Sequence, residues 1–325
     1  MMDRRAWLMG SLGFLATPLV TAAQPPARVF RIGLLGGSTP TSPESHIWEA
    51  FFQELRNLGY VESQNVVFEG RFYGDKVEQL PSFAAELVRL NVDVIVAAAS
   101  PAPEAARRAT ATIPIVMANH ADPVGSGLVA SFARPGGNVT GLSLPGMELR
   151  LKQLQLLKEI VPRLSRVAFL RQPTIPLDHR ELEAAARSLT IRVQVVEARA
   201  PGEFPEAFAA ATRERAGALI VLAGSMFFAN RTRLAELAVK SRMPAVYLLR
   251  EHVQAGGLLA YGVDIRDNFR RAAGYVDRIL KGIRAADLPV EQPTKFELAI
   301  NLKAAKAIGL TIPPSVLARA DHLLE

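Results

Sequence analysis

The chain has 325 residues, of which 49% are hydrophobic and 21% charged, so it is long enough for one large folded domain or for two lobes. It contains no cysteine, which excludes disulfides, thiol nucleophiles and cysteine-ligated zinc. Its net charge is +7, but Lys and Arg are spread along the sequence without a run of five or more, which favours a basic solvated surface over nucleic-acid binding.

The N-terminal segment, residues 1–23, has the three-part layout of a secretory signal peptide. Arg4 and Arg5 form a positive start, residues 6–20 are uncharged and mostly apolar, and small residues lead up to a cleavage position after Ala23. A membrane-spanning helix is the alternative, but the apolar core falls short of the roughly 20 residues that a span needs. We therefore expect a protein that is exported and loses this segment.

The arginine pair leaves the export route open. Arg4 and Arg5 precede Trp7 and Leu8, as in twin-arginine signals, which direct the export of proteins that are already folded. Asp3 stands before the pair, where a small polar residue is commoner, so the general secretory route stays an alternative. No later apolar run is long enough to span a membrane, so we expect no span in the mature chain.

Beyond the signal, short apolar runs alternate with stretches of helical periodicity. In the first half, the pattern predicts strands at 29–35, 65–72, 92–99 and 113–118 and helices at 47–58, 77–90 and 102–111. After a long helix at 147–160, it repeats with strands at 166–170, 191–196, 218–223, 245–249 and 257–261 and helices at 178–189, 203–215 and 230–241. Such alternation predicts an α/β fold of two Rossmann-like lobes, each a parallel sheet with helices on both faces.

Three loops are expected to carry the chain between the lobes, at 138–144, 261–265 and 287–293. They define an N-terminal lobe of residues 28–142 with about 265–288, and a C-terminal lobe of residues 143–262 with about 292–325. Three crossings of this kind would form a hinge that lets the lobes open and close over a cleft.

The glycine-rich segment 122–143, "DPVGSGLVASFARPGGNVTGLS", raises the question of a dinucleotide site, because Gly125 to Ala130 has the spacing G-x-G-x-x-A. That fingerprint needs its first glycine at the end of a strand and an acidic residue about 20 positions later. Here six residues separate Gly125 from the strand end at Ala118, and no acidic residue is correctly placed. A helix from Val124 that is capped by Asp122, followed by a turn and a strand, explains the segment better.

The same segment resembles the signature of periplasmic substrate-binding proteins of ABC transporters, of the tryptophan/tyrosine-binding-like type. Four further segments resemble this family: "LRNLGYVESQNV" at 55–66, the helix and strand at 84–96, "LPVEQPTKFEL" at 288–298 and "GLTIPPS" at 309–315. The resemblance covers nearly the whole mature chain. It implies the type I periplasmic-binding fold, a small-molecule ligand held in the cleft, an ABC permease with its ATPase as partners, and neither enzyme activity nor a cofactor. We expect a monomer.

In open α/β sheets, ligands bind beyond the carboxyl ends of the strands, which defines the candidate residues. They are Ser38, Ser100, Asn119, His120 and Asp122 in the first lobe, Arg171, Gln172, Ser225 and Met226 in the second, and Tyr261 and Asp264 at the second crossing. Ser100 begins a helix and could receive a carboxylate, and Asp264 could pair with an amine. The alternatives are helix capping for Ser38, Ser100 and Asp264, a structural turn for Asp122, and a loop position without a role for His120.

The chain departs from the family pattern after the first strand of the second lobe. Many relatives have W-N-P there, whereas this chain has Arg171-Gln172-Pro173, which argues against an aromatic amino-acid ligand. We expect an amino acid or a small carboxylate-like ligand. An exported NAD(P)-dependent enzyme of Rossmann type and a ligand-sensing module remain as alternatives. The sequence contains no G-x-S-x-G, Walker A or H-E-x-x-H motif, and we predict neither catalytic nor metal-binding residues.

Overall fold

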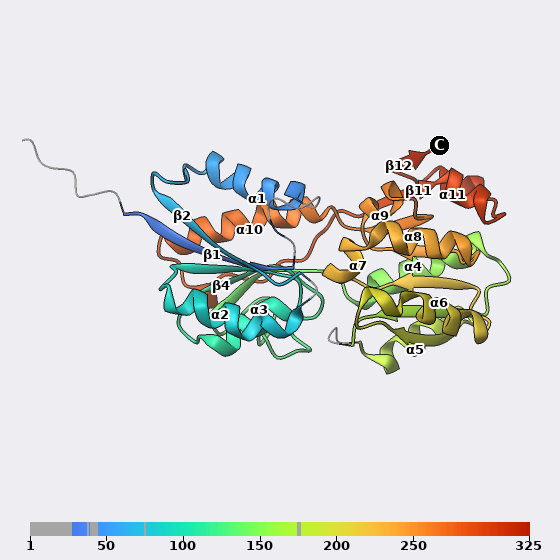
Figure 1. Cartoon of the computed structure of the whole chain (residues 1–325), viewed down its shortest axis with the longest axis horizontal. Coiled ribbons are helices and arrows are strands. Elements are labelled where there is room, and N and C mark those ends of the chain that lie inside the picture. Colours follow the sequence, from blue (N-terminus) through green and yellow to red (C-terminus); the bar gives the residue numbers. More distant parts are fainter. Residues whose placement is uncertain (1–27, 38, 40–44, 75, 174–176) are drawn as a thin grey trace, which may run out of the picture.

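The computed structural model describes residues 28–325 except 38, 40–44, 75 and 174–176, so the predicted signal at 1–23 lies outside the described residues. Two α/β lobes lie side by side along the long axis of the molecule (Figure 1). Each lobe is built on its own sheet, one of five strands and one of seven. The fold is the predicted one, with two Rossmann-like lobes.

The sheet of the first lobe is parallel throughout, in the order β2-β1-β3-β4-β5. Its strands are β1 (Phe30–Gly36), β2 (Val66–Phe72), β3 (Val94–Ala98), β4 (Ile115–His120) and β5 (Val139–Ser143). The runs of Val, Ile, Leu and Ala in β3 and β4 are almost wholly buried because helices cover both faces of the sheet. All five carboxyl ends therefore face the same edge, toward the second lobe (Figure 1).

Two pairs of helices cover this first sheet. One face holds α1 (Ser45–Asn57) and α10 (Ile265–Leu280), and the other holds α2 (Leu80–Arg89) and α3 (Pro101–Ala109), with the short turn η1 (Val77–Gln79) before α2. Trp48 of α1 packs edge-on against Phe269 of α10, with the ring centroids 5.0 Å apart. Thus α10, which is remote in sequence, belongs to the core of the first lobe.

The sheet of the second lobe has the order β12-β11-β10-β9-β8-β6-β7. Its strands are β6 (Arg166–Arg171), β7 (Arg192–Glu197), β8 (Ala218–Val221), β9 (Ala245–Tyr247), β10 (Leu259–Gly262), β11 (Glu297–Asn301) and β12 (His322–Leu324). One pair departs from the predicted parallel sheet, since β11 runs antiparallel to β10. The reason is that the chain reaches β11 from the first lobe, without the helical crossover that a parallel neighbour requires.

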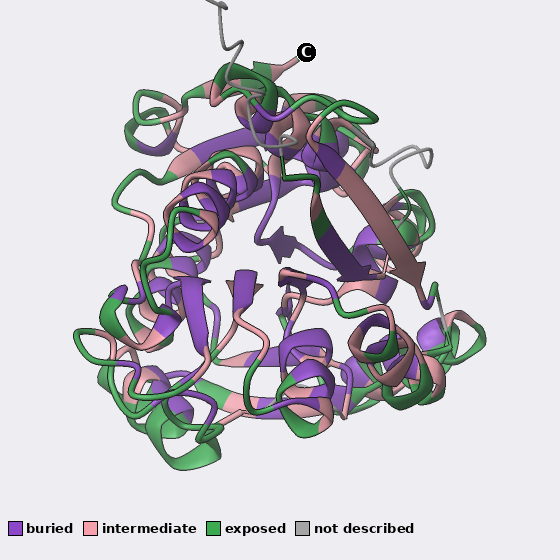
Figure 2. Cartoon of the chain, turned by 90° about the vertical axis from the view of Figure 1, so that its left-hand side faces the viewer, coloured by how far each residue is buried: buried purple, intermediate pink, exposed green. Residues whose placement is uncertain are grey.

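The helices of the second lobe also form two layers. One face is covered by α4 (Met147–Ile160), α5 (His179–Ser188), α11 (Leu302–Ala307) and α12 (Pro314–Leu317). The other is covered by α6 (Phe204–Arg213), α7 (Ser225–Ala229), α8 (Arg231–Lys240) and α9 (Arg250–Gln254), with the turn η2 (Pro201–Glu203) before α6. Figure 2 shows that exposed residues gather on the outer helices and loops and buried ones in the sheets and the inner faces of the helices.

The chain crosses between the sheets three times: after β5, between β10 and α10, and between η3 (Ala285–Asp287) and β11. The first and third crossings are bonded to each other. Ser143 N–H donates to the carbonyl of Glu291 over 2.9 Å, and Glu291 N–H donates to the carbonyl of Gly141 over 3.0 Å. The Thr140 hydroxyl also donates to the carbonyl of Leu288, which lies on the third crossing. These bonds hold the two crossings side by side as they leave the first lobe.

The helix predicted from Val124 is wrong, because residues 123–130 form consecutive turns and bends. The Asp122 carboxylate does accept a bond from Gly125 N–H over 2.7 Å, as a cap would. However, Gly127 has a φ of +70°, a left-handed conformation that stops a right-handed helix after one turn. Gly125 and Gly127 therefore lie in a tight loop in place of a helix.

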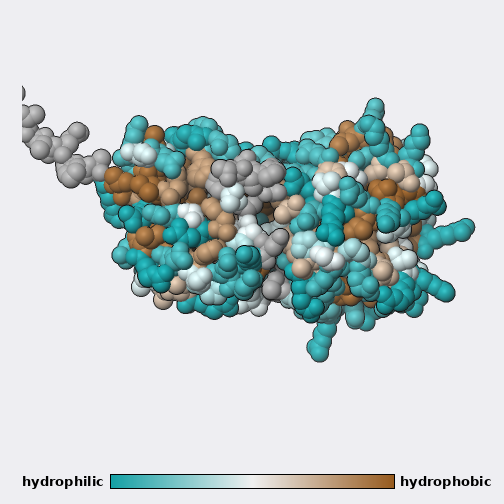
Figure 3. All heavy atoms as spheres, in the orientation of Figure 1, coloured by the Kyte–Doolittle hydropathy of each residue, from teal (hydrophilic) through white to brown (hydrophobic). Residues whose placement is uncertain are grey.

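The surface of the described residues is mostly polar. Figure 3 shows hydrophilic side chains over most of one face, with apolar groups in smaller patches between them. None of the helices in the described part of the chain has the length and apolar character that crossing a membrane demands.

Candidate functional site

A cleft lies between the two lobes, where the carboxyl ends of the central strands of both sheets meet. It holds about 820 Å³ of space, including the part that opens to solvent. The first lobe contributes the ends of β1, β3 and β4, and the second contributes the ends of β8 and β9 together with α7 and α9. The larger apolar side chains of its wall are Trp48, Leu144, Leu222, Phe228, Leu249 and Phe269.

The polar side chains of the first-lobe wall hold neighbouring loops in place. Asn119 at the end of β4 accepts a bond from Ala99 N–H through Oδ1 over 2.7 Å. Ala99 has a φ of +69°, which is unfavourable for a residue with a side chain, so this bond secures a strained turn. Ser100 accepts a bond from Ala121 N–H through Oγ over 3.0 Å. The ends of β3 and β4 are thus tied together by two side chains of the wall.

The bond to Ala99 also fixes the orientation of the Asn119 amide. Because Oδ1 accepts from a backbone N–H, the amide nitrogen Nδ2 takes the other position. Among the described residues, no hydrogen-bond acceptor contacts Nδ2. Two N–H groups on the first-lobe wall are therefore available to a ligand oxygen.

His252 of α9 is the polar residue of the second-lobe wall that is buried most deeply, with 5% of its surface exposed. Its Nδ1 lies 3.2 Å from the carbonyl oxygen of Leu249, and its ring stacks on Tyr247 with centroids 4.7 Å apart. Burial lowers the pKa of the imidazole to about 4, and the charge of Arg231 adds to the shift. The ring is therefore neutral at physiological pH.

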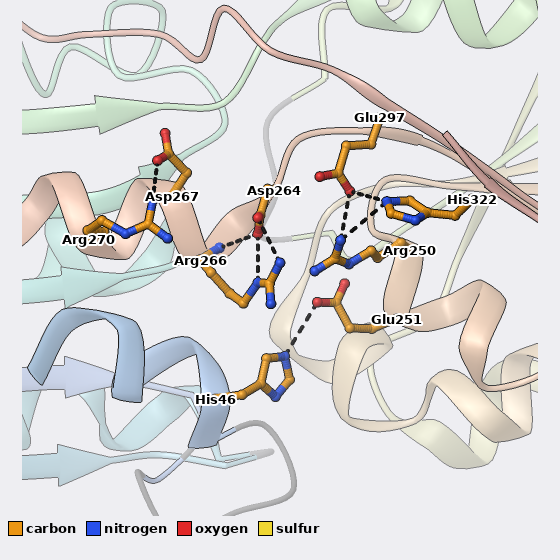
Figure 4. Close-up of polar contacts among 9 residues, drawn as sticks. All are labelled: His46, Arg250, Glu251, Asp264, Arg266, Asp267, Arg270, Glu297 and His322. Carbon is orange, nitrogen blue, oxygen red and sulfur yellow. Dashed lines mark hydrogen bonds and ion pairs between the residues drawn. The ribbon is translucent and has the colours of Figure 1, made fainter. Parts of the chain in front are cut away.

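Side chains of the two lobes touch at the cleft. The hydroxyls of Tyr73 and Ser225 lie 3.1 Å apart, so the loop after β2 is bonded to the start of α7. His46 of α1 and Glu251 of α9 approach to 3.4 Å between Nε2 and Oε1, and Figure 4 shows this contact joining helices of different lobes. The lobes are therefore in contact across the cleft, as in a closed arrangement.

The structure distributes the predicted site residues over several places. Ser100, Asn119 and Ser225 line the cleft. Ser38 lies outside the described residues. His120 is fully buried behind the wall: Nδ1 accepts from Asp122 N–H over 3.1 Å, and Nε2 is 3.5 Å from a carboxylate oxygen of Glu104.

Two further predicted residues lie on the second lobe away from the cleft lining. Arg171 forms an ion pair with Glu197 of the neighbouring strand at 2.6 Å. Gln172 is buried, and its amide lies 3.8 Å from the sulfur of Met226, a buried residue of α7. The departure from the family pattern at 171–172 therefore does not reach the described wall of the cleft.

The residues predicted at the second crossing have structural partners. The carbonyl of Tyr261 accepts a bond from Gln153, and its ring stacks on Phe296. Asp264 caps α10 and binds the guanidinium of Arg266, as Figure 4 shows. Burial alone would raise the pKa of the Asp264 carboxyl, but its bonds to Arg266 and the charge of that residue hold the pKa below its usual value. This is the capping role that the sequence left open for Asp264.

A second cavity, with about 870 Å³ of space, lies beside the first crossing. Asp122, Arg150, Asp178 and Glu181 line it, and Leu144 and Leu222 border both cavities. Burial lowers the pKa of Arg150 to about 10, and its guanidinium contacts Gln153 at 3.4 Å. Asp122 is thus a turn residue at the edge of this polar cavity and does not line the apolar cleft.

Reasoning from strand ends missed the residues of the wall that lie on helices. Trp48 lies in the helix predicted at 47–58, and neither Phe269 nor His252 was among the candidate residues. An apolar residue that lines a cleft has the same periodicity as one in a core, so the pattern could not separate them. The signal that would have pointed to His252 is a histidine soon after a buried strand, at 245–249.

The cleft suits a ligand with a largely apolar body. Among the described residues that line it, none is Asp, Glu, Lys or Arg. The described part of the chain also holds no group of His, Asp and Glu residues that could bind a metal ion. The hypothesis of a dinucleotide site at 125–130 lacks a structural basis. Gly125 lies in a loop, and no helix begins there whose N-terminus could bind a pyrophosphate.

The sequence is similar to those of known proteins. The model of a family described as ABC transporter substrate binding protein matches residues 44–324. A curated relative, the tyrosine-binding protein of Clostridioides difficile, is 25% identical over 267 residues, which are 81% of this chain and 76% of the relative.

Solved structures resemble the chain over most of its length. An ABC domain from Streptococcus pneumoniae in complex with L-Trp is 25% identical, with a TM-score of 0.83 over 91% of this chain and 100% of that one. A conserved domain protein from Vibrio cholerae is 26% identical, with a TM-score of 0.84 over the same shares. A leucine-binding protein from Thermotoga maritima, 14% identical with a TM-score of 0.54 over 80% of this chain and 78% of that one, shares the fold.

Proposed function

Because the chain belongs to the family of ABC transporter substrate-binding proteins, we propose that it captures a small molecule in the cleft between its lobes and delivers it to a permease powered by an ATPase. The observation that carries this proposal is the cleft itself. Both lobes supply its walls, and the lobes touch across it through Tyr73 with Ser225 and His46 with Glu251. A ligand in such a cleft touches both lobes and so stabilises their closed arrangement.

The ligand that we propose is an amino acid or a small carboxylate-like molecule with an apolar body. The aromatic side chains Trp48, Phe228 and Phe269 suit a planar or apolar group, and the Asn119 amide suits a carboxylate or carbonyl oxygen. Two relatives support the class: one is named a tyrosine-binding protein, and the other was solved with L-Trp. We propose binding without chemical turnover, in keeping with the family.

We further propose that the protein works in the periplasm as a monomer, after removal of the signal at 1–23. The match to a family of ABC transporter substrate-binding proteins supports a role beside an importer, and the order of basic and apolar residues at the start of the sequence supports export. The two lobes would then meet the permease with the ligand enclosed. Mass spectrometry of the exported protein would test the cleavage after Ala23.

A thermal-shift screen tests the proposed capture. Purified mature protein is melted with amino acids, aryl carboxylates and NAD(P), and each solute that raises the melting temperature is titrated by calorimetry. We expect a member of the first two classes to bind saturably and to remain chemically unchanged. Conversion of the solute would contradict the proposal, and a shift with NAD(P) alone would favour the dinucleotide enzyme.

Scattering provides a second test with a different readout. Binding is expected to reduce the radius of gyration of the ligand-free protein, because the ligand stabilises the closed lobes. A saturable ligand that leaves the radius unchanged would show that closure is not part of capture.

A further inference from the structure

We propose that His252 is a ligand-binding residue and that its Nε2 atom selects ligands whose apolar body bears an uncharged hydrogen-bond donor, such as a phenol hydroxyl or a ring N–H. The inference rests on the proposed capture of a solute in the cleft, and it names the chemistry that the second-lobe wall recognises. It depends on the orientation of the His252 imidazole, on the hydrogen carried by Nδ1, and on the residues around the ring.

The imidazole has a fixed orientation. Its ring stacks on Tyr247 at an interplanar angle of 16° and meets the ring of Phe228 edge-on, with centroids 5.9 Å apart. Only 5% of the residue is exposed, and it lies in the wall of the cleft. A ring held between two aromatic neighbours cannot turn freely to find another partner.

The contact with Leu249 determines which nitrogen carries the hydrogen. A carbonyl oxygen can only accept, so Nδ1, which lies 3.2 Å from it, is the donor. A neutral imidazole has one N–H, and burial keeps this ring neutral by lowering its pKa to about 4. The Nε2 atom is therefore a bare acceptor.

That acceptor is buried and unused. Within the described part of the chain, Nε2 of His252 has no hydrogen-bond partner. A buried acceptor without a donor carries a desolvation cost, which a ligand that supplies the donor recovers on binding. The gain belongs only to ligands with a donor at that point, so the residue discriminates between otherwise similar molecules.

The surroundings of the ring restrict the donor to an uncharged group. An ammonium placed against the buried Nε2 would be desolvated there without a carboxylate among the described lining residues, and this limit applies to the group at Nε2 and not to ligand groups elsewhere. Arg231, whose guanidinium donates to the carbonyl of Phe228, adds a positive charge near the imidazole. A hydroxyl or a ring N–H on an aromatic body meets both conditions, because the wall around it is formed by Trp48, Phe228 and Phe269.

Matched pairs of probes test this selection, each pair differing by one donor. They are L-tyrosine and L-phenylalanine, 3-(4-hydroxyphenyl)propionate and 3-phenylpropionate, and L-tryptophan and 1-methyl-L-tryptophan. In at least one pair we expect the member with the donor to bind roughly 5- to 100-fold more tightly to the wild-type protein. Equal affinities in every pair that binds would overturn the inference.

The variant His252→Phe keeps the stacked ring and removes the acceptor. We expect the affinity ratio within the pair to fall to about 1, mainly because the member with the donor is weakened. His252→Gln, which can present an oxygen at a similar reach, should keep part of the ratio. The matched control is His179→Phe, the same exchange at an exposed position at the start of α5, where the ratio should not change. A ratio that survives in His252→Phe would overturn the inference.

The same experiments separate this inference from the proposed function. If other solutes bind saturably but none of the six probes does, the selection for an uncharged donor is wrong and the capture of a solute stands. If no solute of the wider screen binds, the proposed capture itself fails. Melting of the ligand-free His252→Phe variant checks the fold, because the exchange removes the unused Nε2 and also the Nδ1–H bond to the carbonyl of Leu249.

Discussion

The two walls of the cleft are both built from strand ends, yet they use their polar atoms differently. On the first-lobe wall, Asn119 and Ser100 accept bonds from backbone N–H groups and so hold the ends of β3 and β4 together. On the second-lobe wall, Nε2 of His252 lacks a partner within the described residues. The first wall therefore uses its side-chain oxygens to hold its own backbone, whereas the second wall leaves an acceptor nitrogen without a partner.

The largest expected effects are losses of stability from two glycine substitutions, one in the strand that leaves each lobe. A Cβ atom on Gly141 of β5 would lie 2.2 Å from the carbonyl oxygen of Met117, and one on Gly262 of β10 would lie 1.9 Å from that of Leu248. Gly141 also has a φ of +123°, which a residue with a side chain rarely adopts. We expect Gly141→Ala to reduce the free energy of unfolding by about 4 kcal/mol and Gly262→Ala by about 2 kcal/mol.

Urea unfolding of both variants measures these two losses in the free energy of unfolding. Gly274→Ala on α10, where a Cβ would meet nothing within 4 Å, is the control and should be neutral or slightly stabilising. A loss for Gly141→Ala smaller than that for Gly262→Ala would show that the backbone of the first crossing relaxes around the added methyl group.

The next effect is a dependence of the free energy of unfolding on pH, which arises from His252 on the second-lobe wall. The folded imidazole of His252 has a pKa of about 4, because it is buried, against about 6.5 when it is exposed. As the pH falls from about 6.5 to about 4, the unfolded state therefore binds a proton that the folded state does not. The free energy of unfolding should fall over this range by an amount on the order of 3 kcal/mol.

Unfolding curves at a series of pH values check this slope in wild type and in His252→Phe. The variant has no such imidazole, so its stability should depend less steeply on pH between about 6.5 and about 4. Identical slopes in the two proteins would mean that the imidazole is protonated as easily in the folded state as in water.

A smaller effect is expected at the first wall, on the bond between Asn119 and Ala99. Asn119→Ala removes the acceptor and leaves a backbone N–H at a strained residue without its partner. We expect a loss of about 2 kcal/mol in the free energy of unfolding. Asn119→Asp keeps an acceptor oxygen and should recover most of it, as measured in the same unfolding experiment. An equal loss in both variants would show that the amide nitrogen, and not the oxygen, matters for stability.

The smallest effect concerns a contact between the walls. Tyr73→Phe removes the hydroxyl that lies 3.1 Å from that of Ser225, and Ser225→Ala removes the other partner. Each should shift the balance toward open lobes by about 1 kcal/mol or less, and the double variant should equal either single one. The radius of gyration of the ligand-free protein measures the balance. Additive changes would indicate that the two hydroxyls act through different neighbours.

Much of the fold was predictable because its signals are local. The apolar runs at 92–99 and 113–118 became β3 and β4, and the stripe at 47–58 became α1. The helix from Val124 failed because the backbone of Gly127 adopts the left-handed region, which no periodicity shows. The antiparallel pairing of β11 with β10 could not be anticipated either, since it follows from where the third crossing re-enters the sheet.

Part of the cleft was predictable from the order of the strands. Parallel strands bring their carboxyl ends to one edge, so counting strand ends reached Ser100, Asn119 and Ser225. His252 also follows a predicted strand, at 245–249, but its role depends on a carbonyl at 3.2 Å and on an aromatic stack that only the folded chain brings together. Whether these residues contact a ligand stays a prediction.

One side chain described above has a practical consequence. The sequence contains two tryptophans, Trp7 in the predicted signal and Trp48 in the wall of the cleft. If export removes residues 1–23, the mature chain has a single indole fluorophore, and it is buried among Phe51, Phe72 and Phe269 beside the space that a solute would fill. The intrinsic fluorescence of the unlabelled protein should then change in wavelength or intensity when a ligand fills the cleft. Binding could therefore be followed through Trp48 without an added label.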